Sequence, residues 1–340
     1  MQLYMPSQNI HHFIDFHGKA PSAVTPDMWE HLIEGETRDG FGFILKDNIN
    51  DLGYQSITVP GSLKAYYEVH SQYGPIPWSD ICQPAIGYAE DGFVIKPHVH
   101  FWMNLTDQLG RVDNKDRLSF TEDGRRIYLE NGKVRKLGSL IKNPDLGRTL
   151  RRIAEGGSDV FYKGDIAEEI AQDMAANGGL LSIEDLNTYE TKKLDPIWGE
   201  YRDHKISTNS PPGGGLMLLE MLNILGNFDL ATVGHNSTDY IQIVAEVMKR
   251  ATTDKDAHVG DPDFIHVPLK ELLSREHAQS HANRIKAGEV HHVTRYQRAE
   301  ESKDTTHISV IDDMGNAVSM THSLGMPSGV ISPGLGFMFN

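Results

Sequence analysis

The chain has 340 residues, of which 39% are apolar, so it can bury a large core and does not have the composition of a disordered protein. Its 32 Lys and Arg are outnumbered by 47 Asp and Glu, and the resulting charge of −15 repels phosphate backbones and anionic lipid surfaces. Nucleic-acid partners are therefore not expected, and no apolar run is long enough to predict a membrane span.

The first part of the chain predicts a strand, a loop and two helices. Residues 15–28 predict a strand that passes into a loop. Residues 61–73 are amphipathic, and residues 78–90 carry a second helical pattern. The stretch 106–136 is polar and charged, so we expect surface turns there.

Helical periodicity dominates the middle of the chain. Apolar residues recur at helical spacing through 150–174. Ser182 and Asp185 then resemble a capping box, which predicts the start of another helix. Three further helices are predicted at 216–225, 238–250 and 269–285.

Two local features suggest binding chemistry only weakly. Residues 211–215 are Pro-Pro-Gly-Gly-Gly, but no Gly-Lys-Ser/Thr follows, so a tight turn is favoured over a phosphate loop. The single cysteine, Cys82, has no partner for an internal disulfide and no metal-ligand spacing around it. We expect it to be a small buried apolar residue.

Seventeen histidines raise the question of a metal site. The pairs that attract attention lack both the helical H-E-x-x-H spacing and nearby cysteines, so surface or structural roles are favoured and no metal is predicted. These pairs are His11 with His12, His98 with His100, and His291 with His292.

The end of the chain predicts a β-hairpin. Residues 306–311 and 317–321 alternate β-branched and apolar residues with polar ones. The segment 312–316 between them has the composition of a turn that contains positive φ angles. Thr305 therefore lies where the first strand begins.

A threonine hydroxyl at such a place can act as a nucleophile only if a base takes its proton. Backbone cleavage before Thr305 would free an α-amino group with a pKa of about 7.7 to 8.0, which can be that base. Most threonines at strand starts are strand residues and nothing more, and the hairpin pattern alone leaves both interpretations open.

The sequence around Thr305 resembles a known processing site. The run 305–312, followed by Gly-Asn-Ala-Val at 315–318, resembles the signature of the γ-glutamyltransferase (glutathione hydrolase) family, whose threonine is exposed by self-cleavage. The resemblance extends from about Asp15 to Asn340. Other segments that resemble the family's large subunit are 161–171, 177–180, 185–186, 210–215 and 260–264.

This resemblance implies an α+β fold, the four-layer αββα sandwich of the N-terminal nucleophile hydrolases. Residues 1–304 would belong to a helix-rich large subunit, and residues 305–340 would begin the small subunit. Family members extend beyond both ends of the chain, and their later part holds the oxyanion-hole glycines and an acidic substrate ligand. We therefore expect a piece of a longer precursor, with an incomplete sandwich.

The resemblance also implies a mechanism. The bond between Asp304 and Thr305 would be cleaved autocatalytically, and the two subunits of one precursor would stay paired. Thr305 would then attack small-molecule amides such as glutathione and transfer the γ-glutamyl group to water, amino acids or peptides. No cofactor is implied.

Four further positions follow from the same comparison of motifs. Ser323 matches a second hydroxyl close to the nucleophile, with serine in place of threonine. His17 stands where γ-glutamyl enzymes carry an arginine for the substrate α-carboxylate, and Gly325 replaces an asparagine at the same end of the substrate. A mostly neutral histidine does not reproduce a forked guanidinium contact, although Lys19 offers a nearby positive charge.

These departures leave two alternatives beside γ-glutamyl transfer. One is a related acylase or amidohydrolase of the same superfamily that accepts a simpler acyl group. The other is a catalytically inactive relative. Localisation stays open, because family members are often periplasmic or secreted, whereas residues 1–6 have neither the basic start nor the apolar core of a signal peptide.

Overall fold

The computed structural model describes residues 1–36, 42–106, 111–293 and 305–340. The chain folds as two compact units, and each is assembled from segments that are far apart in the sequence. Unit 1 comprises Met1–Asp15, Lys192–Thr294 and His307–Thr321, and unit 2 comprises Phe16–Thr191, Arg295–Thr306 and His322–Asn340.

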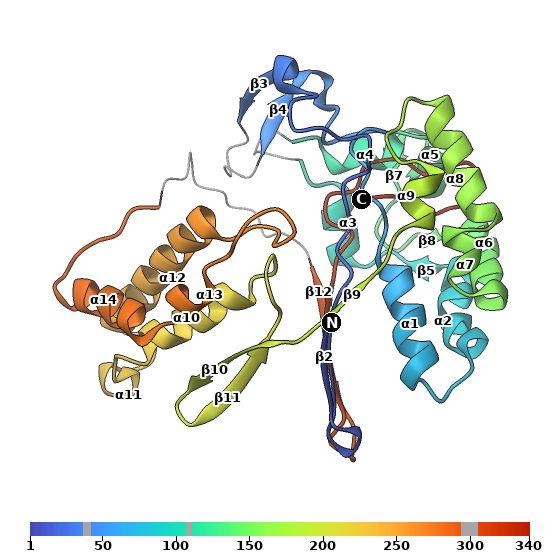
Figure 1. Cartoon of the computed structure of the whole chain (residues 1–340). Coiled ribbons are helices and arrows are strands. Elements are labelled where there is room, and N and C mark those ends of the chain that lie inside the picture. The colour runs from blue at the N-terminus through green and yellow to red at the C-terminus, as the bar shows by residue number, and fades with distance from the viewer. Residues whose placement is uncertain (37–41, 107–110, 294–304) are drawn as a thin grey trace. The chain divides into compact units, whose positions relative to one another are not determined.

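A five-stranded sheet in the order β12-β13-β1-β2-β9 organises unit 1 (Figure 1). β1 pairs antiparallel with both β13 and β2, so the C-terminal hairpin joins the N-terminal one. The predicted C-terminal hairpin is confirmed, and Gly315 in its turn has φ +79°. The strands are β1 Gln2–Met5, β2 Ile10–Asp15, β9 Lys192–Leu194, β12 Thr306–Ile311 and β13 Ala317–His322.

The strand predicted within residues 15–28 is wrong in position. The strand β2 ends at Asp15, and the following residues form a loop with turns as far as the short 3-10 helix η2, Glu30–Leu32. The strand lies earlier than expected, and its consecutive residues Phe13 and Ile14 are both buried. Pro21 and Pro26 lack the N–H that would continue a sheet ladder.

Three helices of unit 1 enclose a small apolar core. Ile224, Val247 and Ala282 are fully buried, one from each helix. The predicted helix 238–250 continues to His258, and the predicted helix 269–285 is divided, because Ser274 caps a new helix by accepting from the His277 N–H at 3.1 Å. The remaining elements of unit 1 are β10 Ile197–Tyr201, β11 His204–Thr208, α10 Gly215–Leu225, α11 Leu230–Val233, α12 Thr238–His258, α13 Leu269–Leu272 and α14 Arg275–Lys286, with η1 Pro6–Gln8.

Unit 2 is mainly helical around a larger core. The predicted helices at 61–73 and 78–90 form as α1 and α2, and the predicted capping box is present, since Ser182 and Asp185 bond each other's backbone. Cys82 is buried, as expected. The helices are α1 Ser62–Tyr73, α2 Trp78–Asp91, α3 Pro97–Met103, α4 Asn114–Ser119, α5 Glu122–Tyr128, α6 Pro144–Gly156, α7 Asp159–Tyr162, α8 Asp165–Ala176 and α9 Ile183–Asn187; the strands are β3 Ile33–Glu36, β4 Phe43–Leu45, β5 Phe93–Val94, β6 Leu129–Glu130, β7 Lys133–Val134 and β8 Leu140–Ile141, with η3 Lys46–Asn48.

The polar stretch 106–136 is not a set of surface turns. It contains α4 and α5, and Arg117 on α4 is fully buried. Its guanidinium pairs with the Asp51 carboxylate at 2.5 Å and donates to the Pro327 carbonyl at 2.8 Å. A charge expected to face water is thus buried because a partner 66 residues earlier compensates it.

The last residues of the chain cross the core of unit 2 without regular secondary structure. Val330, Leu335 and Phe339 are almost completely buried. Helix side chains satisfy the buried carbonyls, since Asn143 donates to Gly336 O at 2.7 Å and Thr149 donates to Leu335 O at 2.9 Å. Among the described residues, no helix combines the length and apolar character needed to cross a membrane.

We expect Arg117→Ala to lower the free energy of unfolding by about 3–5 kcal/mol, because it removes the buried guanidinium that pairs with the Asp51 carboxylate and donates to the Pro327 carbonyl. Urea unfolding followed by circular dichroism measures this loss. The matched control is Arg151→Ala, which breaks an ion pair with Glu90 in which both side chains are substantially exposed, and it should cost much less. Equal losses of unfolding free energy from the two substitutions would contradict the conclusion that the buried contacts of Arg117 stabilise the fold.

Candidate functional site

The C-terminal hairpin determines how Thr305 and Ser323 face each other. Its turn is closed by the Asp312 N–H, which donates to Asn316 O at 3.0 Å. Counting outward in this antiparallel register places Thr305 opposite Ser323, directly beyond the last paired strand residues. Opposed residues in such a ladder have Cα atoms about 4.5–5.5 Å apart, so this register brings the two positions to the same open end of the hairpin. Both residues are exposed.

The side chain of His307 holds the two strands together. Its Nδ1 lies 2.7 Å from Thr321 Oγ1 on the opposite strand, and its Nε2 lies 3.0 Å from Ser309 Oγ. His307 therefore acts as a strand residue that links the two strands of the hairpin.

The segment with His17 and Lys19 is fixed by Tyr189. The Tyr189 hydroxyl donates to the His17 carbonyl at 2.8 Å. The Lys19 ammonium lies 5.3 Å from the centre of the Tyr189 ring, within cation–π range. Lys19 also forms an isolated antiparallel bridge with Val59. Both His17 and Lys19 are exposed, which leaves their side chains accessible to a ligand.

A chain of contacts links this segment to Gly325. A side chain at Gly18 would lie 2.5 Å from Thr58 Oγ1, so the backbone approaches Thr58 closely. The Thr58 hydroxyl donates to Asn340 Oδ1. The Asn340 amide in turn lies beside Gly325, because a Cβ built there would be 3.3 Å from Asn340 Nδ2. Thr58 and Asn340 therefore connect two segments more than 300 residues apart.

Tyr66 on α1 provides a second link between the same segments. Its ring packs edge-on against Phe16, with ring centres 6.0 Å apart. Its hydroxyl is hydrogen-bonded to His322 Nδ1 at 3.0 Å. Burial raises the pKa of this hydroxyl, so it stays protonated at neutral pH. Tyr66 thus contacts both Phe16, which precedes His17, and His322, which precedes Ser323.

Ser323 is prepared to act as a hydrogen-bond donor. Its Oγ accepts from the Gly325 N–H at 2.9 Å, which leaves its own proton available. Of the residues predicted for the site, Thr305, Ser323, Gly325, His17 and Lys19 all belong to unit 2. Asp304, predicted to precede the cleaved bond, lies outside the described residues.

The whole chain, residues 1–340, matches the family model described as gamma-glutamyltranspeptidase. The chain belongs to the γ-glutamyltranspeptidase family. It is 34% identical to the glutathione hydrolase proenzyme of Escherichia coli K12, over 96% of this chain and 55% of that protein. It is also 34% identical to the acylase ACY 1 proenzyme of Pseudomonas sp. strain SE83, over 97% of this chain and 58% of that protein. The chain thus spans a little more than half the length of these relatives.

Two solved structures have folds similar to that of this chain. Helicobacter pylori γ-glutamyltranspeptidase is similar with a TM-score of 0.72 and 28% identity, over 83% of this chain and 77% of that one. A cephalosporin acylase from Bacillus halodurans is similar with a TM-score of 0.78 and 26% identity, over 99% of this chain and 59% of that one. The predicted α+β class of the N-terminal nucleophile hydrolases is confirmed.

Two segments on which the resemblance was based also meet in space. Ser210 and Pro211 lie with Pro262, Asp263 and Phe264 around a cavity of about 630 Å³ in unit 1. The predicted tight turn at 211–215 is present, since the Gly213 N–H donates to Ser210 O at 3.1 Å.

Sequence reasoning missed one group of side chains. His277 and His281 are four residues apart on α14, and with Asp254 on α12 and Glu220 on α10 they gather at one place in unit 1. The i, i+4 spacing of the two histidines was the available signal, because it puts both rings on one helix face. The histidine pairs considered from sequence did not include it.

We expect Gly325→Ala to lower the free energy of unfolding by about 1–2 kcal/mol, because Gly325 has φ +70° and a left-handed backbone is costly for alanine. Urea unfolding measures the effect. The control is Gly87→Ala inside α2, where an added Cβ meets nothing within 4 Å, and it should leave stability unchanged or raise it by up to about 1 kcal/mol. A Gly325 variant as stable as the parent would show that the loop readily adopts another conformation.

Proposed function

We propose that Thr305 is the nucleophile of a self-processing amidohydrolase and acyltransferase, and that processing divides the precursor after residue 304. The observation that supports this most is the hairpin register, which, counted beyond the last paired residues, pairs position 305 with position 323 in a chain of the γ-glutamyltranspeptidase family. Residues 1–304 would then contribute to the large subunit and residues 305–340 would begin the small one.

In the processing step, Thr305 Oγ attacks the carbonyl carbon of Asp304 and the peptide nitrogen leaves with the proton, which gives an ester. Water then hydrolyses the ester and frees the α-amino group of Thr305. In turnover this amine accepts the Thr305 hydroxyl proton while Oγ attacks the substrate amide, and it returns the proton to the departing amine. Water or a second amine takes the acyl group and regenerates the hydroxyl.

The role proposed for Ser323 is to position the nucleophile. Its hydroxyl retains a free proton, so it can donate to Thr305 Oγ or accept from the Thr305 ammonium. The proposed acyl group is γ-glutamyl, from amides such as glutathione. An acylase with a simpler acyl group is the second candidate, because His17 and Gly325 depart from the γ-glutamyl pattern and the chain is as similar to an acylase as to a glutathione hydrolase.

Thr305→Ala should abolish both processing and turnover, with a loss of activity of at least about 10⁴-fold, because nucleophile and base disappear together. Intact-mass analysis under denaturing conditions should find two polypeptides from the parent protein, the smaller one beginning at Thr305, and one from the variant. Thr306→Ala is the matched control and should still be processed. A single uncut chain from the parent would instead support an inactive relative.

Ser323→Ala should retain processing at a reduced rate and lower kcat by about tenfold to 100-fold, the range expected for one hydrogen bond to a charged group. Ser323→Thr keeps the hydroxyl and should restore most of the activity. If both variants lose activity equally, the hydroxyl is not the feature that matters at this position.

The acyl group can be assigned with paired substrates. Release of p-nitroaniline from a γ-glutamyl anilide, stimulated by a dipeptide acceptor, is expected for the γ-glutamyl enzyme. His17→Arg should then lower KM for this substrate by about tenfold or more, because a guanidinium forks onto the α-carboxylate. Hydrolysis only of acyl amides without the α-amino acid group would identify an acylase, and His17→Arg would not improve it.

A further inference from the structure

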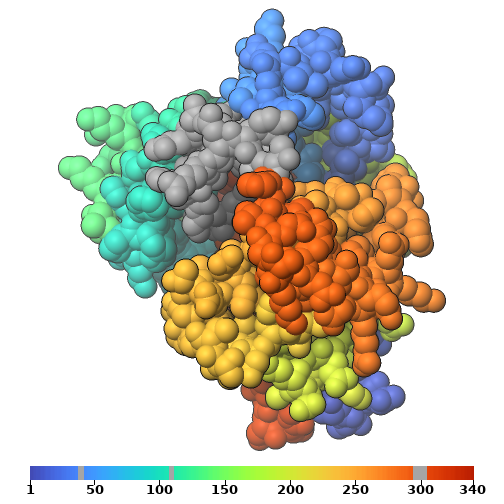
Figure 2. Space-filling model, turned by 90° about the vertical axis from the view of Figure 1, so that its left-hand side faces the viewer, coloured from blue at the N-terminus to red at the C-terminus, as the bar shows by residue number. Residues whose placement is uncertain are grey.

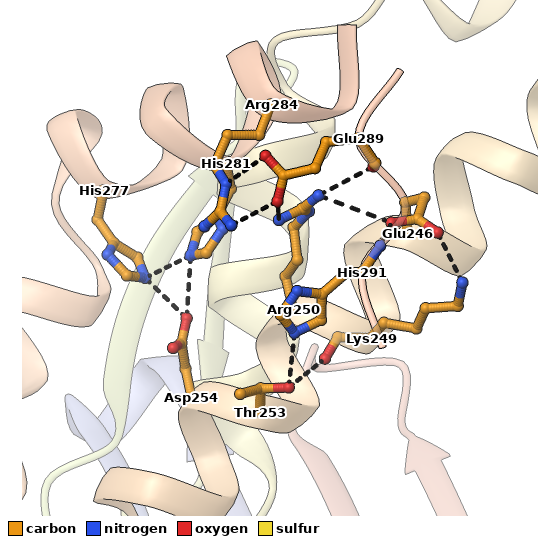
Figure 3. A network of polar contacts seen from close by, with 10 residues as sticks. All are labelled: Glu246, Lys249, Arg250, Thr253, Asp254, His277, His281, Arg284, Glu289 and His291. Atoms are coloured by element: carbon orange, nitrogen blue, oxygen red, sulfur yellow. Dashed lines mark hydrogen bonds and ion pairs between the residues drawn. The ribbon is translucent and has the colours of Figure 1, made fainter. Parts of the chain in front are cut away.

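Four side chains from three helices of unit 1 point at one place that the proposed catalytic chemistry does not use. They are Glu220 on α10, Asp254 on α12, and His277 and His281 on α14. Their ligand atoms all lie within 4.8 Å of one another. Figure 3 shows both imidazole rings directed at the Asp254 carboxylate.

The separations lie at or just below those of ligand atoms around a small cation. Nε2 of His277 and Nε2 of His281 each lie 3.0 Å from Asp254 Oδ2 and 3.1 Å from each other. Nε2 of His277 is 3.4 Å from Glu220 Oε1. A tetrahedral zinc ion with bonds of 2.0–2.2 Å sets its ligand atoms about 3.3–3.6 Å apart.

Hydrogen bonds alone do not supply a donor and an acceptor for each of these close contacts. Two imidazole nitrogens and one carboxylate oxygen form a triangle of short contacts. If both nitrogens donate to the oxygen, their protons face each other across 3.1 Å. If only one carries its proton, the other nitrogen and Asp254 Oδ2 place two lone pairs in contact. A cation between the three atoms removes this conflict.

Charge and burial favour a cation as well. Glu220 is 1% exposed and lies within the same cluster as Asp254, so a cation here would compensate two neighbouring carboxyl groups, one of them buried. Two carboxylates and two neutral imidazoles would balance a divalent ion.

The charges nearby are already paired among themselves. Arg284 forms an ion pair with Glu289 at 2.5 Å, and the buried Arg250 lies 3.7 Å from both Glu246 and Glu289. Lys249 pairs with Glu246 at 2.6 Å. Figure 3 places this network beside the cluster, and its cations are compensated by their own carboxylates.

We propose that Glu220, Asp254, His277 and His281 bind one zinc ion that joins α10, α12 and α14. Two imidazoles with two carboxylates suit zinc better than magnesium or calcium, which prefer more oxygen ligands. Four protein ligands leave no open position, so the role is structural. The ion would fasten three helices that also share a small apolar core, which includes Ile224, Val247 and Ala282.

The site is accessible to an ion from solvent. The side chains of His277 and Asp254 are 22% and 18% exposed, whereas Glu220 is buried beneath them. Atoms of α14, in orange, reach the surface on the face drawn in Figure 2. The inference does not depend on Thr305 being the nucleophile, because none of the four residues takes part in the proposed catalytic steps.

Isothermal titration of chelator-treated protein with Zn²⁺ tests the proposal. The parent protein should bind one ion per chain tightly, and His277→Ala/His281→Ala should weaken this binding beyond the about 10–100-fold typical of changes around a metal site. Bound Co²⁺ should give the intense visible absorption of tetrahedral coordination. Zn²⁺ should also raise the thermal midpoint of the parent, and not that of the double variant.

The matched control is His98→Ala/His100→Ala, which removes two histidines of α3 in unit 2 and should leave the affinity unchanged. If the double variant at α14 does not fold by circular dichroism, the single variant His277→Gln decides, with an expected loss of at least about tenfold. The proposal is overturned if the parent has no tight site, if the control weakens binding as much as the α14 variants, or if bound Co²⁺ lacks the tetrahedral spectrum.

Discussion

The candidate site depends on one constraint. The polar backbone groups of a buried, irregular C-terminal segment need hydrogen-bond partners. Residues 327–340 cross the core of unit 2 without helix or strand, so their polar backbone groups lack the partners that regular structure supplies. Side chains from the surrounding helices take over this role. Side-chain donors to this segment include Arg117 to Pro327 O, Asn143 to Gly336 O and Thr149 to Leu335 O, beside backbone hydrogen bonds such as Ser328 N–H to Phe339 O.

This constraint reaches the proposed site through the two ends of the segment. At one end, the Pro327 carbonyl accepts a hydrogen bond from Arg117. Pro327 is close in sequence to Ser323 and Gly325. At the other end, the Asn340 amide accepts from Thr58 and lies beside Gly325. Because both ends are fixed, the strand end opposite Thr305 has a defined position. A threonine that serves as both nucleophile and base needs such a defined neighbour.

Unit 1 handles buried polar groups differently from unit 2. In unit 2, the buried C-terminal segment receives hydrogen bonds from single side chains to its carbonyls, and Arg117 pairs with Asp51. In unit 1, Arg250 and Glu246 are buried in the helices that also carry the four-residue cluster, and partners on neighbouring segments compensate them. Unit 1 combines a small apolar core with buried charged side chains, so its stability depends on each buried charge having a partner. In such a unit, a bound cation has a large effect on stability.

The sequence alone determined the features that depend on neighbouring residues. The C-terminal hairpin followed from alternation and turn composition, the helices at 61–73 and 78–90 from periodicity, and the helix after Ser182 from its capping box with Asp185. Each of these signals acts over a few residues. The chemistry of Thr305 was different, because spacing left two interpretations open and the resemblance to a family raised one of them.

Only the tertiary structure decided which polar residues are buried and what they meet. Arg117 lies in a stretch whose composition predicts exposure, and its partner Asp51 is 66 residues away. The cluster of His277 and His281 becomes visible as a site only when two other helices bring Asp254 and Glu220 to it. The physical reason is common to both cases: burying a charge is favourable only with its partner in place, and no local pattern encodes where a distant partner will lie.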